Sequence, residues 1–216
     1  MDPSVTLLLV AFTCGTSLLA FQDEGVFSGF SFNPYLIKHK REFHRFLTSA
    51  LIHANYIHLV LNMYVLYMFG PFVEEMLGYL EGNTAIGRLL FALLYVSAAP
   101  ISAIYSFEKH KHNPHYNAVG ASGAISAVVF AFIVLRPGSS MGLVFLPFLR
   151  LPAVLFGVLY LWYSWVMARR GGDKIGHDVH FFGALYGMAF MFIYKPGLFK
   201  SLLEKMAEFS PLSLSF

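Results

Sequence analysis

The sequence predicts an all-α membrane protein, a bundle of six transmembrane helices with a first loop at the membrane interface. The chain has 216 residues, of which 57% are hydrophobic and only 12% charged, about half the charged fraction of a soluble domain. Its apolar residues fall into six runs separated by short polar, glycine- or proline-containing segments. No change of composition marks a linker, so we expect one helical domain over residues 1–195 and an interfacial amphipathic tail over residues 196–216.

Composition also narrows the classes of function. The net charge of +3 is small, and the basic residues lie in short loops, so a nucleic-acid partner is not expected. Cys14 is the single cysteine, which excludes an intramolecular disulfide and a metal site built from several cysteines. A histidine-rich loop over residues 108–117 has one nearby carboxylate, Glu108, and is interpreted as solvated. We therefore expect no metal and no cofactor.

The predicted spans are bounded by polar or helix-breaking residues. The first run follows no positively charged segment, so it is interpreted as a retained transmembrane helix and not as a signal peptide. Residues 22–51 mix aromatic and basic side chains with glycines and Asn33-Pro34, which indicates an irregular loop at headgroup level. An apolar loop is predicted over residues 142–151. The six predicted spans cover residues 5–21, 58–77, 88–107, 119–135, 153–167 and 177–194.

A serine opens the fourth predicted span. Residues 119–135 read VGASGAISAVVFAFIVL, with Ser122 inside a Gly-Ala-Ser-Gly turn. A polar group in lipid needs a partner or a function, because leaving it unpaired costs several kcal/mol. A serine that only packs between helices is the simpler interpretation. The span is short for a full crossing, which needs about 20 residues, and this would place Ser122 in a water-accessible hollow.

Two other spans carry polar residues on one helical face. On the second span, His58 and Asn62 lie at one end of a face and Glu74 at the other. This face is expected to turn toward the bundle interior, either as a hydrogen-bonding seam or as paired donors aimed at a reacting group. On the sixth span, His180 shares a face with small residues that permit close helix packing. If that face meets the small residues of the fourth span, His180 meets Ser122. The small residues concerned are Gly183, Ala184 and Gly187 on the sixth span, and Gly120, Gly123 and Ala127 on the fourth.

Taken together, these motifs resemble those of the rhomboid family of intramembrane serine proteases. The resemblance extends over nearly the whole chain. It also includes a G-x3-E-x3-G pattern centred on Glu74 and an arginine, Arg45, in the first loop. It implies a six-span fold in which Glu74, Arg45, Gly123, Gly183 and Gly187 are structural.

The resemblance also implies a mechanism based on a Ser–His dyad without a third carboxylate. Ser122 would be the nucleophile and His180 the general base, since a serine hydroxyl needs a base within hydrogen-bonding reach. The backbone N–H of Ser122 and the side chains of His58 and Asn62 would stabilise the oxyanion. Gly120 is assigned to the same oxyanion region, where a glycine lets the backbone approach a substrate closely.

The chain departs from the family pattern at two positions. Four residues after the nucleophile the family usually carries an aromatic residue that stacks on the catalytic histidine, whereas this chain has Ser126. The histidine ring is then expected to be held another way or less firmly. His44 replaces a tryptophan that usually precedes the loop arginine.

The expected function is endopeptidase cleavage of membrane proteins within a transmembrane helix. The expected partners are such substrates and the lipid bilayer, and the expected location is a bacterial inner or plasma membrane. One alternative is a catalytically weak or inactive relative that binds membrane clients. Another is a channel or a haem or metal protein that uses His58, His177 and His180, although no matching histidine pair stands at equal depth.

Overall fold

The computed structural model describes residues 4–143, 146–170 and 175–208 of the chain. Helices dominate this part, and they lie close to the predicted spans. The long helices are α1 (Val5–Ala20), α5 (Tyr56–Glu81), α6 (Thr84–His110), α7 (Ser122–Leu135), α8 (Ala153–Arg170), α9 (His177–Tyr194) and α10 (Gly197–Glu208). The shorter elements are α2 (Glu24–Phe30), α3 (Pro34–Lys40), α4 (Arg45–Thr48), the 3₁₀ turn η1 (Ser49–Leu51), and strands β1 (Ser140–Leu143) and β2 (Leu146–Pro152).

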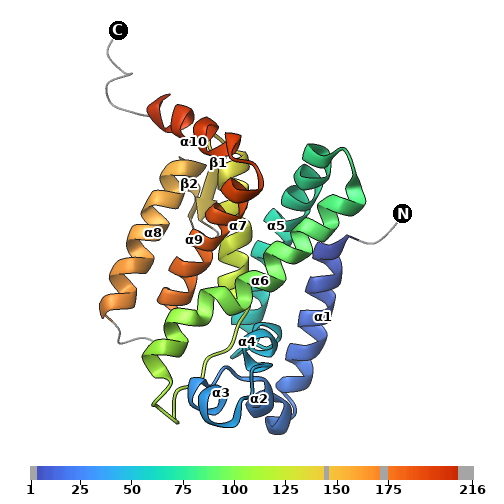
Figure 1. Cartoon of the computed structure of the whole chain (residues 1–216), viewed down its shortest axis with the longest axis vertical. Coiled ribbons are helices and arrows are strands. Elements are labelled where there is room, and N and C mark those ends of the chain that lie inside the picture. Colours follow the sequence, from blue (N-terminus) through green and yellow to red (C-terminus); the bar gives the residue numbers. More distant parts are fainter. Residues whose placement is uncertain (1–3, 144–145, 171–174, 209–216) are drawn as a thin grey trace.

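Helix α7 is the centre of the bundle. It packs against α5, α6 and α9, while α1 flanks α5 on one side and α8 flanks α9 on the other (Figure 1). All but three of its 14 residues are buried. The short helices α2, α3 and α4 gather at one end of the bundle, and the β1–β2 hairpin and α10 lie at the opposite end (Figure 1). Helix α7 is apolar on every side, and a helix of this kind needs the enclosed position that its neighbours provide.

Two of the described helices, α5 and α6, are long and apolar enough to cross a membrane by length and composition. Helices α1 and α7 are apolar but have only 16 and 14 residues. The prediction of a helical bundle is therefore confirmed for the described residues, and the count of six membrane spans stays a prediction.

The expectation of an all-α chain is wrong at one place. Residues 142–151 were expected to form an apolar loop, but β1 and β2 form an antiparallel hairpin in which Met141 pairs with Leu151 and Gly142 with Arg150. Buried backbone N–H and C=O groups need partners, and an apolar chain reversal obtains them by pairing with itself. Strand β2 contains Pro147. Both strands of a two-stranded hairpin are edge strands, where a proline is tolerated.

The first loop is more regular than its composition suggested, because local caps start its helices. The Asp23 carboxylate accepts hydrogen bonds from the backbone N–H groups of Gly25 and Val26 and opens α2. The Asn33 side chain accepts from the N–H of Leu36 and opens α3, with Pro34 in its first turn. The Asn33-Pro34 pair therefore marks a helix start, a role in which both residues are favoured.

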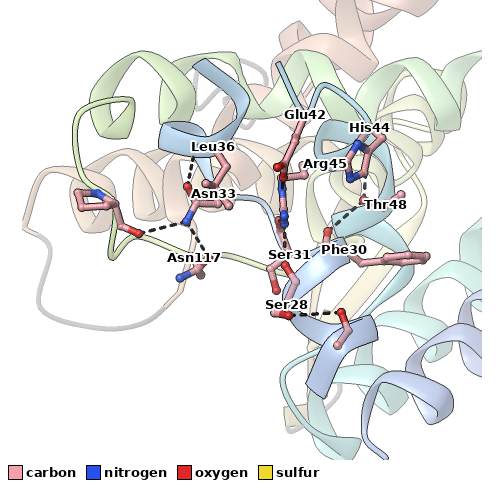
Figure 2. A network of polar contacts seen from close by, with 12 residues as sticks. Ser28, Phe30, Ser31, Asn33, Leu36, Glu42, His44, Arg45, Thr48 and Asn117 are labelled. Carbon is pink, nitrogen blue, oxygen red and sulfur yellow. Dashed lines mark hydrogen bonds and ion pairs between the residues drawn. The ribbon is translucent and has the colours of Figure 1, made fainter. Parts of the chain in front are cut away.

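Arg45 forms hydrogen bonds with three other residues of the first loop (Figure 2). Its Nη1 donates to the carbonyl oxygens of Ser28 and Ser31, each at 2.7 Å, and its Nε donates to a Glu42 carboxylate oxygen at 2.6 Å. The Arg45 side chain is buried, and its hydrogen bond to Glu42 holds the pKa of that half-buried carboxyl below its usual range. Arg45 thus satisfies carbonyl groups around the end of α2 that no helix could pair.

The first loop is also attached to the segment that leads into α7. The Asn33 amide donates to the carbonyl of Pro114 and to the side chain of Asn117, as Figure 2 shows. Phe32 and Ala118 exchange backbone hydrogen bonds at 2.9 and 3.0 Å. The two loops therefore form one structure at this end of the bundle.

The C-terminal tail forms a helix as far as Glu208, and residues 209–216 lie outside the described residues. Helix α10 packs against α7 and α9, with Leu202 buried and the Phe199 ring 5.2 Å from that of Phe192. The interfacial position of this tail and the division of the chain at residue 195 stay predictions.

Glu74 caps the first helix from within the second long one. Its carboxylate accepts hydrogen bonds from the Ser4 hydroxyl, the Val5 N–H, and both the N–H and the hydroxyl of Thr6, at 2.7 to 3.0 Å. A negative charge at a helix N-terminus satisfies N–H groups that have no partner inside the helix and interacts favourably with the helix dipole.

We expect Glu74→Ala to destabilise the protein, because it leaves several buried donors of α1 without an acceptor. The cost should be about 1–3 kcal/mol, which lowers the Tm in detergent by at least about 2 °C for a chain of this size. The neighbouring Glu75 is exposed, so Glu75→Ala is the matched control and should leave the Tm unchanged. Equal shifts in the two variants would contradict the cap.

Candidate active site

Ser122 is the first residue of α7 and is half-buried. The turn before it depends on Gly120, whose φ of +124° lies in a region that favours glycine. The Gly120 N–H donates to the carbonyl of Ser49 at 2.9 Å, which joins the turn to η1. The N–H groups of the first turn of α7 have no acceptor inside the helix. Ser122 thus stands where backbone donors are available to an anion.

Helices α7 and α9 touch backbone to backbone. A Cβ added to Gly183 would lie 2.2 Å from the carbonyl oxygen of Gly123, and one added to Gly187 would lie 2.2 Å from that of Ala127. Two matched pairs of small residues therefore remove any side-chain layer between these helices, as in close-packed membrane helices.

This contact brings Ser122 and His180 to the same level of the bundle. Gly123, which follows the serine, lies against Val179, which precedes the histidine; a Cβ on Gly123 would be 2.6 Å from Val179 Cγ1. His180 is half-buried, like Ser122. The hydrogen bonds of the described residues include none between these two side chains. Bonds between a nucleophile and its base are often long before substrate binds, and here the chain neighbours of the two residues, Gly123 and Val179, are in contact.

The His180 ring is held by its aromatic neighbours. The Tyr160 ring of α8 lies 6.5 Å from it at an interplanar angle of 23°, and the His177 ring lies 6.0 Å from it edge-on. Asp178 is buried, and its carboxylate accepts from the Ser106 hydroxyl at 2.5 Å.

His58 lies directly over the turn that precedes Ser122. A Cβ on Gly120 would be 2.7 Å from His58 Cε1 and 2.9 Å from Nε2, so only glycine leaves room for this ring. The N–H of Ala54 donates to His58 Nδ1 at 3.5 Å. A neutral imidazole that accepts at Nδ1 carries its proton on Nε2, and an Nε2–H donor beside Gly120 is the tautomer that an oxyanion requires.

Asn62 lies one helical turn further along α5 and is buried. Its amide nitrogen donates to the backbone carbonyl of His58 at 2.9 Å. An amide nitrogen carries two hydrogens, so the second remains for another acceptor. The predicted donors His58 and Asn62 therefore lie on one face of α5, and His58 borders the turn that carries Ser122.

His53 is a part of this site that the sequence analysis missed. It is fully buried, and its Nδ1 lies 3.0 Å from the Ser17 hydroxyl of α1, which itself donates to the Leu51 carbonyl. Its Nε2 accepts from the N–H of Ala121 at 3.5 Å. His53 thus links α1 to the residue before Ser122. It stands in a loop without periodicity, so only the tertiary contacts identify it.

Among the described residues, no three His, Cys, Asp or Glu side chains gather as a metal site would require. The rings of His177 and His180 are neighbours on one helix, and His58 faces Gly120. The histidines singled out for a haem or metal protein are therefore engaged in separate contacts.

A rhomboid domain matches residues 40–197 of the chain. The chain belongs to the rhomboid family. Rhomboid proteins have a helical membrane fold, which agrees with the apolar helices α5 and α6, and the family includes serine proteases. The match spans every residue of the candidate site described above.

Several relatives agree with this assignment. RHOMBOID-like protein 12, mitochondrial, of Arabidopsis thaliana is 28% identical over 195 residues, which are 85% of this chain and 56% of the plant protein. Presenilin-associated rhomboid-like protein A, mitochondrial, of Danio rerio is 30% identical over 65% of this chain and 34% of its own length. YdcA of Bacillus subtilis is 32% identical over 47% of this chain and 46% of its own length. The chain spans between a third and just over half of these relatives.

We expect Gly183→Ala to destabilise the bundle, because its methyl group would collide with the backbone of Gly123. Overpacking of this kind costs about 1–3 kcal/mol and should lower the Tm by several degrees. Gly15→Ala on α1 is the matched control, since a Cβ there meets nothing within 4 Å. A Gly183→Ala protein as stable as the Gly15→Ala protein would contradict the contact.

Stability should fall at low pH because His53 is buried in its neutral form. Burial, with a smaller effect of the neighbouring His58, lowers the pKa of His53 from 6.5 to about 3. The unfolded chain then binds the proton first, so this contribution is complete above about pH 6.5 and is lost as the pH falls toward 3, by at most about 1.4 kcal/mol per pH unit.

Urea unfolding of the detergent-solubilised protein between pH 7.5 and pH 4.5 measures this effect. His53→Gln keeps a polar side chain and removes the titrating group, so its stability should depend less steeply on pH. Identical slopes for the two proteins would rule out the His53 contribution.

Proposed function

We propose that this rhomboid protein is an intramembrane serine endopeptidase with a Ser–His dyad. In this proposal Ser122 is the nucleophile and His180 the general base. The N–H of Ser122, the side chains of His58 and Asn62, and the turn at Gly120 stabilise the oxyanion. The observation that carries the proposal is the glycine contact between α7 and α9, which sets Ser122 and His180 at one level of the bundle.

The reaction would proceed in two halves. Ser122 Oγ attacks the substrate carbonyl while its proton passes to His180, and the carbonyl oxygen takes up a negative charge. The tetrahedral intermediate collapses, the C–N bond breaks, and His180 returns the proton to the leaving amine. Water then attacks the acyl-enzyme, with His180 again taking and returning a proton. Both side chains are half-buried, so water can reach them.

Two features of the structure support the proposed oxyanion site. His58 presents Nε2–H beside Gly120, and the first-turn N–H groups of α7 lack acceptors inside the helix. Preorganised donors are often the largest contribution to such catalysis, and losing one typically costs about 100-fold or more in rate.

The proposed substrates are membrane proteins with a transmembrane helix that can unwind near small or helix-breaking residues. They would approach laterally past α8, whose large apolar side chains are exposed; those more than 40% exposed are Leu155, Val158, Leu159, Trp162, Tyr163 and Trp165. The membrane in which this occurs is also a proposal. We expected a bacterial membrane, whereas the plant and fish relatives are named as mitochondrial proteins.

A fluorophosphonate probe tests the proposal. We expect the detergent-solubilised protein to be labelled, and labelling to be lost in Ser122→Ala and reduced by at least about 100-fold in His180→Ala. Exposed residues of the same types provide the controls, since Ser201→Ala and His115→Ala should label like the wild type. Cleavage of a transmembrane reporter in proteoliposomes should follow the same order.

The competing function is that of a catalytically inactive relative that binds membrane clients. The replacement of the usual aromatic residue by Ser126 is the observation in its favour. A folded wild-type protein that is neither labelled nor cleaves the reporter would overturn the protease proposal and favour this alternative.

A further inference from the structure

Ser126 lies one helical turn after Ser122 and is buried. Its hydroxyl and that of Tyr160 are 2.8 Å apart, so one donates to the other across the α7–α8 interface. The ring of the same Tyr160 faces His180 of α9, with the two ring centroids 6.5 Å apart.

The Tyr160 ring is held in a defined orientation. Besides the hydrogen bond at its hydroxyl, it packs against Phe130 of α7, with ring centroids 5.6 Å apart, and lies near-parallel to Phe156 of α8 at 6.3 Å. Its ring plane is within 23° of the His180 plane, at a centroid distance of 6.5 Å. These distances and angles are within the range of offset-stacked rings.

Two other groups near His180 have partners of their own. The buried carboxylate of Asp178 accepts from Ser106, on α6. The His177 ring meets His180 edge-on at 6.0 Å, and also contacts Tyr163. An imidazole that must accept a proton from Ser122 has to keep one face and one nitrogen in place, and the Tyr160 ring limits its rotation from one side.

We propose that Tyr160 is the positioning residue for His180, and that the Ser126–Tyr160 hydrogen bond sets its ring; this rests on the function proposed above. The nucleophile and the ring that supports its base are then on different helices, α7 and α8. Helix α8 packs against α9 and less closely against α7, and its buried residues are few: Ala153, Val154, Gly157 and Ser164. The docking of α8 on the bundle and the orientation of the base are thereby coupled.

Kinetics of Tyr160 variants test the proposal. Tyr160→Leu keeps apolar volume but removes the ring, and should lower both kcat on a transmembrane reporter and the rate of fluorophosphonate inactivation by about tenfold or more, since small misplacements of reacting groups have large effects. KM should change by less than about twofold, because a residue that acts only on the base does not bind substrate. Tyr160→Phe keeps the ring but loses the hydroxyl that bonds to Ser126, so its kcat should lie between those of the wild type and the Leu variant.

Two further variants separate positioning from structure. Tyr79→Leu makes the same change at a tyrosine of α5 that is 78% exposed, away from the proposed substrate path, and should leave kcat unchanged. The double variant Tyr160→Leu/Ser126→Tyr supplies a ring from α7 instead and should recover part of the lost kcat. The Tm of each protein is measured alongside, so that a loss of rate in a protein of normal stability is assigned to position 160.

A Tyr160→Leu protein with wild-type kcat would overturn the proposal, and so would equal losses in the Leu and Phe variants or a loss of rate that tracks Tm alone. Each of these results is read against a wild type that is labelled at Ser122, so the protease function stands when the positioning role fails. Absence of labelling in the wild type is the separate failure of the proposed function.

Discussion

The backbone contact between α7 and α9 is the constraint on which the rest of the structure depends. Gly123 faces Gly183 and Ala127 faces Gly187 without a side chain between them. Lipid supplies no hydrophobic driving force between helices, so close packing of this kind has to hold them together. Helix α7 has only 14 residues and is buried on nearly every side, so its depth and rotation are set by its neighbours. The position of Ser122 relative to His180 follows from this single contact.

Several polar side chains of the bundle form hydrogen bonds with backbone groups at helix ends that have no partner inside the helix. Glu74 accepts from four donors at the start of α1, and Arg45 donates to the carbonyls of Ser28 and Ser31 near the end of α2. His53 connects Ser17 of α1 with the N–H of Ala121. In an apolar setting an unpaired backbone group is costly, so each of these residues stabilises a chain end and fixes its direction. Among these three side chains, His53 is the one that bonds to the turn before Ser122, through the N–H of Ala121.

The two sides of the candidate site are built differently. Around the proposed oxyanion donors, the Gly120 N–H donates to the Ser49 carbonyl and His58 Nδ1 accepts from the N–H of Ala54. Around the proposed base, His180 has ring neighbours, including Tyr160 on the loosely packed helix α8. Hydrogen bonds therefore fix the first group, whereas His180 depends on packing with a helix that has few buried residues. Substitutions on α8 should thus affect the base more than the oxyanion donors.

The sequence by itself determined the helical class, the limits of the sixth long helix at His177 and Tyr194, and the small-residue faces that meet at Gly123 and Gly183. Apolar runs and helical periodicity carry that information locally. The hairpin at residues 140–152 and the capped helices of the first loop were missed although their contacts are local, whereas the roles of His53 and Tyr160 could not be read from the sequence. Their roles arise from partners distant in the chain: Tyr160 meets Ser126, and His53 meets Ser17 and Ala121. Such contacts depend on how helices without a local signal are rotated against each other, and only the tertiary structure decides that.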